Sequence, residues 1–211
     1  MFTQLRQPTI SDDETANEMN RYFSTVFIAE DNDNHPYLPF KTPFKLNIVQ
    51  VSSQFVLETL LTLPLRTSAG PDDIPNEFFS KAAYTICDVL TRFFRFLFEH
   101  GILPSEWRLA NVTPIFKKGN RNLCSNYRPI SLTCTCCKIA ERVVKDCILS
   151  FLYQHDLISS SQHGFLTFRS CLSSLLYFLE IISDNVDQGI DVSAIYIDFA
   201  KAFDSVHQFA L

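Results

Sequence analysis

The sequence is poor in glycine and has no long apolar run. Five glycines, two methionines and one tryptophan stand beside 20 phenylalanines in 211 residues. No apolar stretch approaches the ~20 residues that span a bilayer. Residues 1–6 lack the charged and apolar regions of a secretory signal. We therefore expect an intracellular protein, nuclear or cytoplasmic and not secreted, that has no membrane partner.

The seven cysteines form neither a disulfide pattern nor a complete zinc pattern. Their number is odd, and without a secretion signal they are expected to be reduced thiols. Cys134 and Cys137 have the spacing of two zinc ligands, but no second such pair or spaced histidine pair completes the four ligands of a structural site. The favoured interpretation is that these thiols are small buried side chains on a helix.

Charge is distributed unevenly along the chain. The net charge of −5 argues by itself against a nucleic-acid binder. Residues 101–150, however, hold 8 basic and 3 acidic residues, whereas 1–100 hold 8 and 13, and 151–211 hold 2 and 7. Such a local positive excess is typical of a phosphate-binding surface, although a solvated surface without a partner gives the same count.

Apolar periodicity predicts a mostly helical α+β fold. A capping box at Ser11–Glu14 is expected to begin the first helix, and Gly101 is placed to end the third in a left-handed conformation. Residues 30–43 are polar and rich in proline, which indicates a linker. The expected helices cover 11–27, 52–63, 75–100, 131–153 and 170–186, and the expected extended segments cover 111–116 and 192–199.

Four apolar or aromatic residues, 194–197, lead directly into Asp198. A carboxylate at the end of a strand is a common arrangement for holding Mg²⁺, because the strand fixes it while other oxygen ligands and waters complete the octahedron. A helix N-cap is the alternative role, since aspartate commonly caps helices.

Residues 198–206, from Asp198 to Val206, closely resemble the first catalytic motif of non-LTR (LINE-type) retrotransposon reverse transcriptases. Further motifs of that family stand upstream in the same order. They are Gly70–Pro75, Leu103–Trp107, Pro114–Gly119, Asn126–Leu132, Lys138–Arg142 and Gln162–Phe165. The resemblance runs from about residue 51 to the end of the chain, and this many motifs in register make coincidence implausible.

The resemblance implies a partial right-hand polymerase. A helical segment and linker would occupy 1–45, the fingers 46–190, and the start of the palm, with the first palm strand, 191–211. The intact enzyme of this family extends a DNA primer with dNTPs on an RNA template, using two Mg²⁺ ions. The paired aspartates that complete the metal site do not occur in this sequence, so the chain alone is expected to be inactive.

The family's functional residues carry over onto matching positions. Asp198 is implied as the catalytic, metal-binding aspartate, with the backbone carbonyl of Phe199 as a further metal ligand. Phe203 matches the aromatic gate that excludes a ribose 2′-hydroxyl. The basic residues implied to grip the incoming dNTP are Lys117, Lys118 and Arg128, which offer compact charges and a planar fork for phosphate oxygens. The implied template-contacting loop contains Gln162, Gly164, Phe165 and Arg169.

Each assignment has a structural alternative. Phe203 could be a core residue, the two lysines a solvated turn, and Arg128 the partner of a structural carboxylate. The segment Gln162–Phe165 could be a turn with Gly164 at positive φ. A general-base role for His163 is disfavoured, because two-metal chemistry needs no histidine there.

Several positions depart from the family pattern. Asp73 stands where the family usually has glycine. Residues 167–171 read Thr-Phe-Arg-Ser-Cys where a basic residue, Gly, Arg, Ser and Thr are usual, and the customary proline after Val206 is missing. These losses fit a divergent copy. Two other functions stay open: a non-catalytic RNA-binding module that uses residues 101–150, and a retrotransposon remnant without function.

Overall fold

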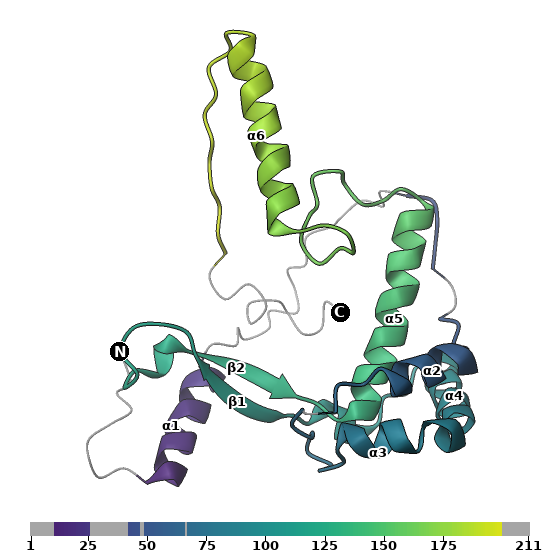
Figure 1. The fold of residues 1–211 in the computed structure, drawn as a ribbon. Coiled ribbons are helices and arrows are strands. Elements are labelled where there is room, and N and C mark those ends of the chain that lie inside the picture. Colours follow the sequence, from purple (N-terminus) through teal and green to yellow (C-terminus); the bar gives the residue numbers. More distant parts are fainter. Residues whose placement is uncertain (1–10, 26–41, 47–48, 66, 200–211) are drawn as a thin grey trace. The chain divides into compact units, whose positions relative to one another are not determined.

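The structure is a computed structural model that describes residues 11–25, 42–46, 49–65 and 67–199. It contains helices and a two-stranded sheet, which confirms a mixed α and β fold (Figure 1). Two compact units are present, one up to Cys147 and one from Ile148. None of the described helices is both long and apolar enough to cross a membrane.

The first unit has a helical core built from four helices. These are α2 (Ser53–Leu61), α3 (Asn76–Lys81), α4 (Ala83–His100) and the first part of α5 (Thr135–Gln154). Their shared core contains Val56, Leu60, Phe79, Ala83, Phe94, Ile139 and Val143. Because these side chains are almost fully buried, the burial of apolar surface is the main force that holds the four helices together.

The predicted helix over 75–100 is divided in two at Ala82. This residue has φ −89° and ψ 2°, so it ends α3 and begins α4. The apolar spacing of Phe79, Ala83 and Cys87 continues across the break, and all three are buried. Periodicity therefore could not reveal the division. Gly101 ends α4 with φ 63° and ψ 31°, the left-handed conformation that the sequence predicts.

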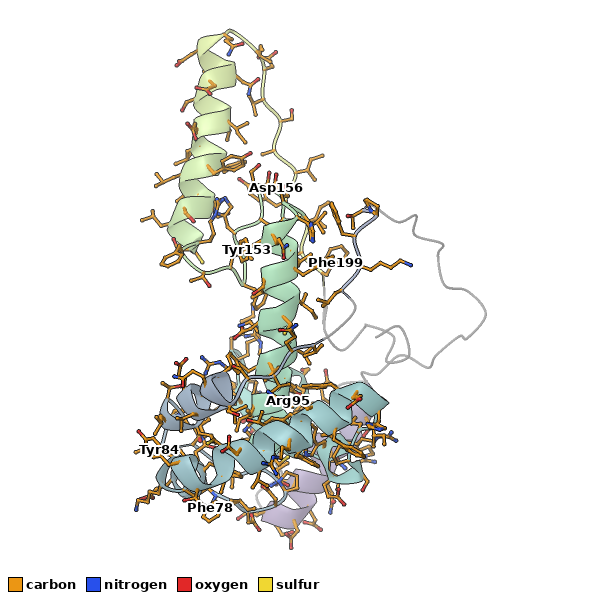
Figure 2. All side chains as sticks on the ribbon, turned by 90° about the vertical axis from the view of Figure 1, so that its right-hand side faces the viewer. Phe78, Tyr84, Arg95, Tyr153, Asp156 and Phe199 are labelled. Atoms are coloured by element: carbon orange, nitrogen blue, oxygen red, sulfur yellow. The ribbon has the colours of Figure 1, made fainter. Side chains whose placement is uncertain are left out.

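A polar link joins α4 to the chain before α2. Two guanidinium nitrogens of Arg95, on α4 (Figure 2), donate to the backbone carbonyl of Val51 at 2.8 and 2.7 Å. Ser52 then caps α2 by accepting a hydrogen bond from the Phe55 amide at 3.1 Å. These bonds fix where α2 begins on the helical core.

The sheet is an antiparallel hairpin of β1 (Asn111–Phe116) and β2 (Tyr127–Leu132). Its register pairs Asn111 with Leu132 and Phe116 with Tyr127. The prediction that a helix starts at 131 is therefore wrong: residues 131–132 belong to β2, and α5 begins at Thr135. The apolar residues from 130 onward fit either period, and pairing with β1 decides the outcome.

Pro114 and Pro129 lie opposite each other in this hairpin. The Lys117 amide donates to the Asn126 carbonyl at 2.8 Å. Because hydrogen-bonded and non-hydrogen-bonded pairs alternate, the proline pair falls at a non-hydrogen-bonded position. Neither proline therefore removes a bond from the ladder, which is why two prolines are tolerated in a sheet of two edge strands.

The helix α1 (Asp12–Ser24) covers a second, smaller core beside the hairpin. Its predicted capping box is confirmed: the Glu14 amide donates to Ser11 Oγ at 3.2 Å, and the Ser11 amide donates to Glu14 Oε2 at 2.9 Å. Met19 and Phe23 pack with Cys124, which lies in the short helix η2 (Cys124–Asn126). Tyr127, the first residue of β2, packs against the same cluster.

A tight turn precedes α3. The Asp73 amide donates to the Gly70 carbonyl at 3.1 Å, and Asp73 itself has φ 54°. The family resemblance of the sequence implies a glycine at this position. The departure thus places a residue with a side chain in the left-handed region, where only glycine is free of steric cost.

We expect Asp73→Gly to raise the free energy of unfolding of the first unit by about 0.5–1 kcal/mol, because it relieves that backbone strain. Asp73→Val should lower it, since β-branched residues fit the left-handed region worst. Urea unfolding followed by Trp107 fluorescence measures both, because Trp107 packs on Phe93 and Phe94 in this unit. Equal stabilities of the two variants would contradict the assignment.

The second unit contains the end of α5, a loop over 155–170, and α6 (Cys171–Asp187). Ser170 caps α6 through a reciprocal pair of hydrogen bonds with Ser173. The chain then returns along α6 (Figure 1), and the rings of Phe178 and Tyr196 lie 6.0 Å apart.

The strand predicted over 192–199, the first palm strand, is not formed in this structure. Residues 190–199 are not paired with any strand among the described residues. Ile195, Ile197 and Phe199 are 78–86% exposed. A strand needs a neighbour for its backbone hydrogen bonds, and β propensity in the sequence does not supply one.

Candidate nucleic-acid interface

The turn between β1 and β2 carries the basic residues that the sequence singles out. Gly119 has φ 89°, and a Cβ there would lie 2.8 Å from the Asn126 side chain. Asn126 Nδ2 donates to the Asn120 carbonyl at 2.8 Å, and the Tyr127 hydroxyl donates to the Arg121 carbonyl at 2.9 Å. The side chains of Asn126 and Tyr127 therefore hold the backbone of the basic turn in one conformation.

Alternation along the hairpin divides its residues between two faces. Phe116 and Tyr127 are directly opposite, with ring centroids 5.5 Å apart, and Tyr127 reaches the core under α1. Arg128 is opposite Ile115, and the Lys117–Asn126 bond continues the same ladder. Lys117 and Arg128 consequently lie on the face turned away from Tyr127.

These cations are exposed and have no acidic partner in the described part of the chain. Lys117, Lys118 and Arg128 are all exposed, and none takes part in a salt bridge there. Elsewhere in the described part of the chain, Arg21 pairs with Glu18 and Lys81 pairs with Glu77, each within a single helix. Arg121 lies with its guanidinium carbon 4.7 Å from the centre of the Phe116 ring. Unneutralised charge therefore gathers at the hairpin, as a phosphate-binding surface requires.

The cysteines around the start of α5 are buried or half-buried thiols. The pKa of Cys136 is raised to about 12, mainly by burial, and that of Cys137 is raised to about 12 by burial together with the nearby Glu141 carboxylate. Burial also raises the pKa of the Cys134 thiol. The burial of these thiols fits the interpretation that they are small buried side chains at the start of a helix.

The predicted template-contacting residues lie together in the loop of the second unit. Gln162 Nε2 donates to the Gly164 carbonyl at 3.0 Å, and Arg169 Nη1 donates to the Ser160 carbonyl at 3.4 Å. The alternative interpretation, a turn with Gly164 at positive φ, is wrong. Phe165 has φ 61° and Phe168 has φ 63°, whereas Gly164 is not among the positive-φ residues. The loop reverses one residue later than the glycine suggests.

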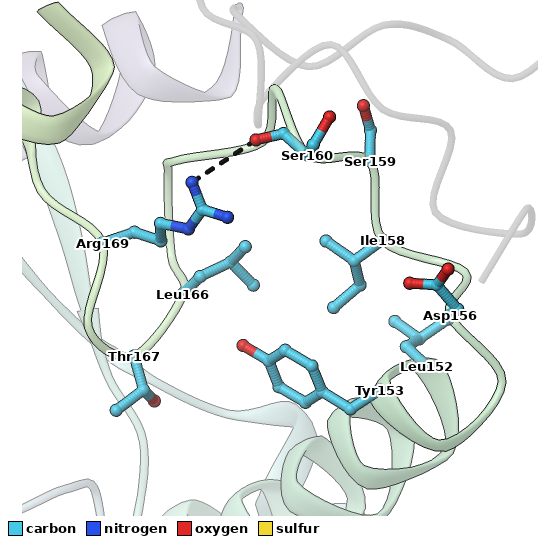
Figure 3. A pocket seen from close by; sticks show the side chains of 9 residues that line it. All are labelled: Leu152, Tyr153, Asp156, Ile158, Ser159, Ser160, Leu166, Thr167 and Arg169. Carbon is cyan, nitrogen blue, oxygen red and sulfur yellow. Dashed lines mark hydrogen bonds between the residues drawn. The ribbon is translucent and has the colours of Figure 1, made fainter. Parts of the chain in front are cut away.

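A pocket of about 440 Å³ lies between the end of α5 and this loop. Figure 3 shows Tyr153, Ile158 and Leu166 around the same hollow, with the Arg169 guanidinium at its rim. Asp156, at φ 51°, adds a carboxylate to the lining. Sequence reasoning did not find Tyr153 or Asp156, because only the fold at the end of α5 places them around the same pocket as Arg169.

The loop is anchored to α6 through a buried histidine. His163 is 9% exposed, and its Nδ1 lies 2.9 Å from Ser173 Oγ. Its ring centroid is 5.6 Å from that of Tyr177, while Nε2 is buried without a hydrogen-bond partner among the described residues. His163 therefore orders the loop by its contact with the cap of α6.

Asp198 and Phe199 lie in the exposed extended segment of the second unit. Within the described ranges, no cluster of three or more His, Cys, Asp or Glu side chains could hold a metal ion. One carboxylate and one backbone carbonyl do not form a site for two Mg²⁺ ions, so no catalytic step is derived from the described residues. Phe203 lies outside them.

Comparison with known proteins relates this chain to polymerases of mobile elements. Residues 115–210 match the family described as reverse transcriptase (RNA-dependent DNA polymerase). The chain is 24% identical over 169 residues to the "Probable RNA-directed DNA polymerase from transposon BS" of Drosophila melanogaster, which covers 79% of this chain and 19% of that protein. It is 23% identical over 169 residues to the "RNA-directed DNA polymerase from mobile element jockey" of the same organism, with 79% and 18% covered.

A third relative is the "Transposon TX1 uncharacterized 149 kDa protein" of Xenopus laevis, 27% identical over 155 residues, with 73% of this chain and 12% of that protein covered. The chain spans less than a fifth of the length of these relatives, since the covered shares are 19%, 18% and 12%. Residues 115–210, a little under half of the chain, are thus similar to a reverse transcriptase domain. Two of these relatives are named as RNA-directed DNA polymerases of mobile elements, and this chain is similar to a part of each.

Proposed function

We propose that this chain supplies the fingers of the polymerase, and that its β1–β2 hairpin grips the triphosphate of the incoming dNTP. The observation that carries the proposal is the set of exposed, unpaired cations on a hairpin held in one conformation. Lys117 and Lys118 provide compact charges at the turn, and Arg128 on β2 provides a planar fork. Because these three side chains form no salt bridge in the described part of the chain, a nucleotide could bind them without first breaking an ion pair.

In the longer polymerase, the loop with Gln162, Gly164, Phe165 and Arg169 would contact the RNA template. Asp198 and the Phe199 carbonyl would contribute oxygen ligands to a catalytic Mg²⁺ site whose other carboxylates lie elsewhere in the enzyme. Phe203 would act as the gate that selects deoxynucleotides. Extension of a DNA primer on RNA is therefore assigned to the longer polymerase and not to the described residues alone.

The hairpin proposal predicts the effect of removing single cations on triphosphate binding. Lys118→Ala and Arg128→Ala should each weaken binding of dATP by about three- to tenfold, because each removes one exposed charge-assisted contact. Inorganic triphosphate should show the same losses, since the contact is to phosphate. Titrations followed by NMR chemical shifts at about 50 and 200 mM salt measure the affinities, and all losses should shrink at the higher salt.

Lys145→Ala is the matched control, because Lys145 is an exposed lysine of the same basic region but lies on α5. It should bind dATP as the wild type does. Arg128→Lys tests the contribution of the planar guanidinium, because it keeps the positive charge and loses the two parallel donors. Its affinity for dATP should lie between those of Arg128→Ala and the wild type. An equal loss in Lys145→Ala, or unchanged binding in both hairpin variants, would show that the hairpin is not the site.

A further inference from the structure

The most exposed aromatic side chain of the described residues lies in the loop of the second unit. Phe168 is 101% exposed, and its backbone has φ 63°. A bulky residue in the left-handed region is a genuine conformational outlier. The strain comes from the phenylalanine side chain, because a glycine would adopt this φ without steric cost. Strained residues that persist often mark a functional site.

The surroundings of Phe168 indicate what could contact the ring. Phe165, three residues earlier, is 87% exposed and also has positive φ. Arg169 follows directly, and apart from the bond of its Nη1 to Ser160, its donors have no partner in the described part of the chain. Two exposed aromatic rings beside a guanidinium that has donors to spare are a typical arrangement for single-stranded nucleic acid, in which bases stack on rings and arginine contacts phosphates.

The loop is held in place before any ligand arrives. The Gln162 amide donates to the Ser159 carbonyl at 3.0 Å, and the Arg169 amide donates to the Leu166 carbonyl at 3.4 Å. His163 fastens the middle of the loop to Ser173 on α6. Binding would therefore cost little ordering of the backbone, which favours affinity.

Charge in this unit excludes a mainly electrostatic contact. Among residues 148–199, Arg169 is the one lysine or arginine, against six acidic residues. These are Asp156, Glu180, Asp184, Asp187, Asp191 and Asp198. Stacking does not depend on the charge of the surface, because every base has a π face. A contact through Phe168 would therefore persist at salt concentrations that weaken phosphate contacts.

We propose that Phe168 is a base-stacking residue for single-stranded RNA, with Arg169 holding an adjacent phosphate. The inference rests on the proposed function, since it specifies how the template-contacting loop would hold the strand. It adds a contact that a glycine at this position could not make.

The test uses the full chain and an adenylate RNA of about 12 nucleotides, a length suited to single-strand sites. Phe168→Gly should weaken binding about five- to tenfold, the lower part of the range for one stacked base. The loss should be the same at about 50 and 300 mM salt. Phe168→Tyr should bind as the wild type does. A strand of equal length made of abasic ribose phosphates should bind Phe168→Gly and the wild type equally.

Two controls separate stacking from unfolding and from general exposure. Phe168→Gly removes the strained conformation, so its thermal stability should be equal to or above that of the wild type. A loss of affinity together with undiminished stability then cannot come from misfolding. Tyr84→Ala removes another exposed aromatic ring, 75% exposed on α4, and should leave RNA affinity unchanged.

The proposal is overturned if Phe168→Gly binds the adenylate RNA as the wild type does, if the abasic strand shows the same loss, or if the wild type binds no RNA. Unchanged RNA affinity with altered self-association in sedimentation would assign Phe168 to a protein contact and also overturn it. The hairpin proposal is tested independently by dATP. A Phe168 effect without effects of Lys118→Ala or Arg128→Ala refutes only the triphosphate grip, and the reverse result refutes only the stacking contact.

Discussion

Gly70→Ala is expected to destabilise the first unit by about 3 kcal/mol or more, because overpacking against backbone cannot be relieved by a rotamer change. Gly70 is buried, and a Cβ there would lie 2.6 Å from both the Cα and the amide nitrogen of Cys134, and 2.7 Å from the carbonyl carbon of Thr133. All three are backbone atoms of the segment that joins β2 to α5. Either the backbone at Gly70 or the segment between β2 and α5 would have to move.

Urea unfolding followed by Trp107 fluorescence measures the loss. Gly101→Ala is the matched control: a Cβ there meets nothing within 4 Å, but φ is 63°. It should cost about 1 kcal/mol through backbone strain alone. If the two variants lose equal stability, the close approach of Gly70 to Cys134 does not determine the role of this glycine.

Asn76→Ala is expected to lower the free energy of unfolding by about 3 kcal/mol, because it leaves several buried polar groups without partners. Asn76 is 7% exposed, and its Nδ2 donates to the Pro64 carbonyl at 2.9 Å and to Thr67 Oγ1 at 2.8 Å. Its Oδ1 accepts from Thr135 Oγ1 at 2.7 Å, and Thr135 is 1% exposed. One amide thus ties the turn before α3 to the first residue of α5.

Thr135→Val is the matched control, since it keeps the shape and removes one donor. It should cost less than Asn76→Ala, because it leaves the bonds to Pro64 and Thr67 intact. The double variant should lose less than the sum of the two single losses, as residues of one hydrogen-bond network do. Additive losses would indicate that Thr135 and Asn76 are stabilised separately.

Both expected losses act on the same junction, the start of α5. This helix follows directly from β2, the strand that carries Arg128. The motif Gly70–Pro75 therefore has a structural role: its glycine admits the backbone between β2 and α5, and Asn76, next along, fastens Thr135. We infer that this family motif, far in sequence from the hairpin, helps to determine how the hairpin leaves the helical core.

Local signals in the sequence were reliable where one residue type decides the conformation. The capping box at Ser11–Glu14 and the left-handed end of α4 at Gly101 are both confirmed. They depend on contacts within four residues, so no distant part of the chain is needed to specify them. The same holds for Asp73 and Phe168. The family resemblance implies a glycine at each position, and both residues have positive φ, the conformation that glycine adopts most easily.

Predictions that needed a distant partner were less secure. The helix expected from 131 gives way to β2, because β1 offers a ladder for residues 127–132. The strand expected over 192–199 finds no partner among the described residues. In the loop of the second unit, positive φ falls on Phe165 and not on Gly164. In each case the propensity of a segment depends on its own residues, whereas strand pairing and loop conformation also depend on residues elsewhere in the chain.

The sequence by itself determined the resemblance to reverse transcriptases, the concentration of cations in residues 101–150, and the helices that end in strong local signals. These features can be identified from the sequence because motifs, local charge and helix caps each depend on residues that are close together in the chain. The tertiary structure alone decided that Lys117 and Arg128 share an exposed face, that Asn76 joins Pro64 and Thr67 to Thr135, and that Tyr153 and Asp156 meet Arg169 around a pocket. These arrangements depend on strand register and on contacts between residues far apart in the chain.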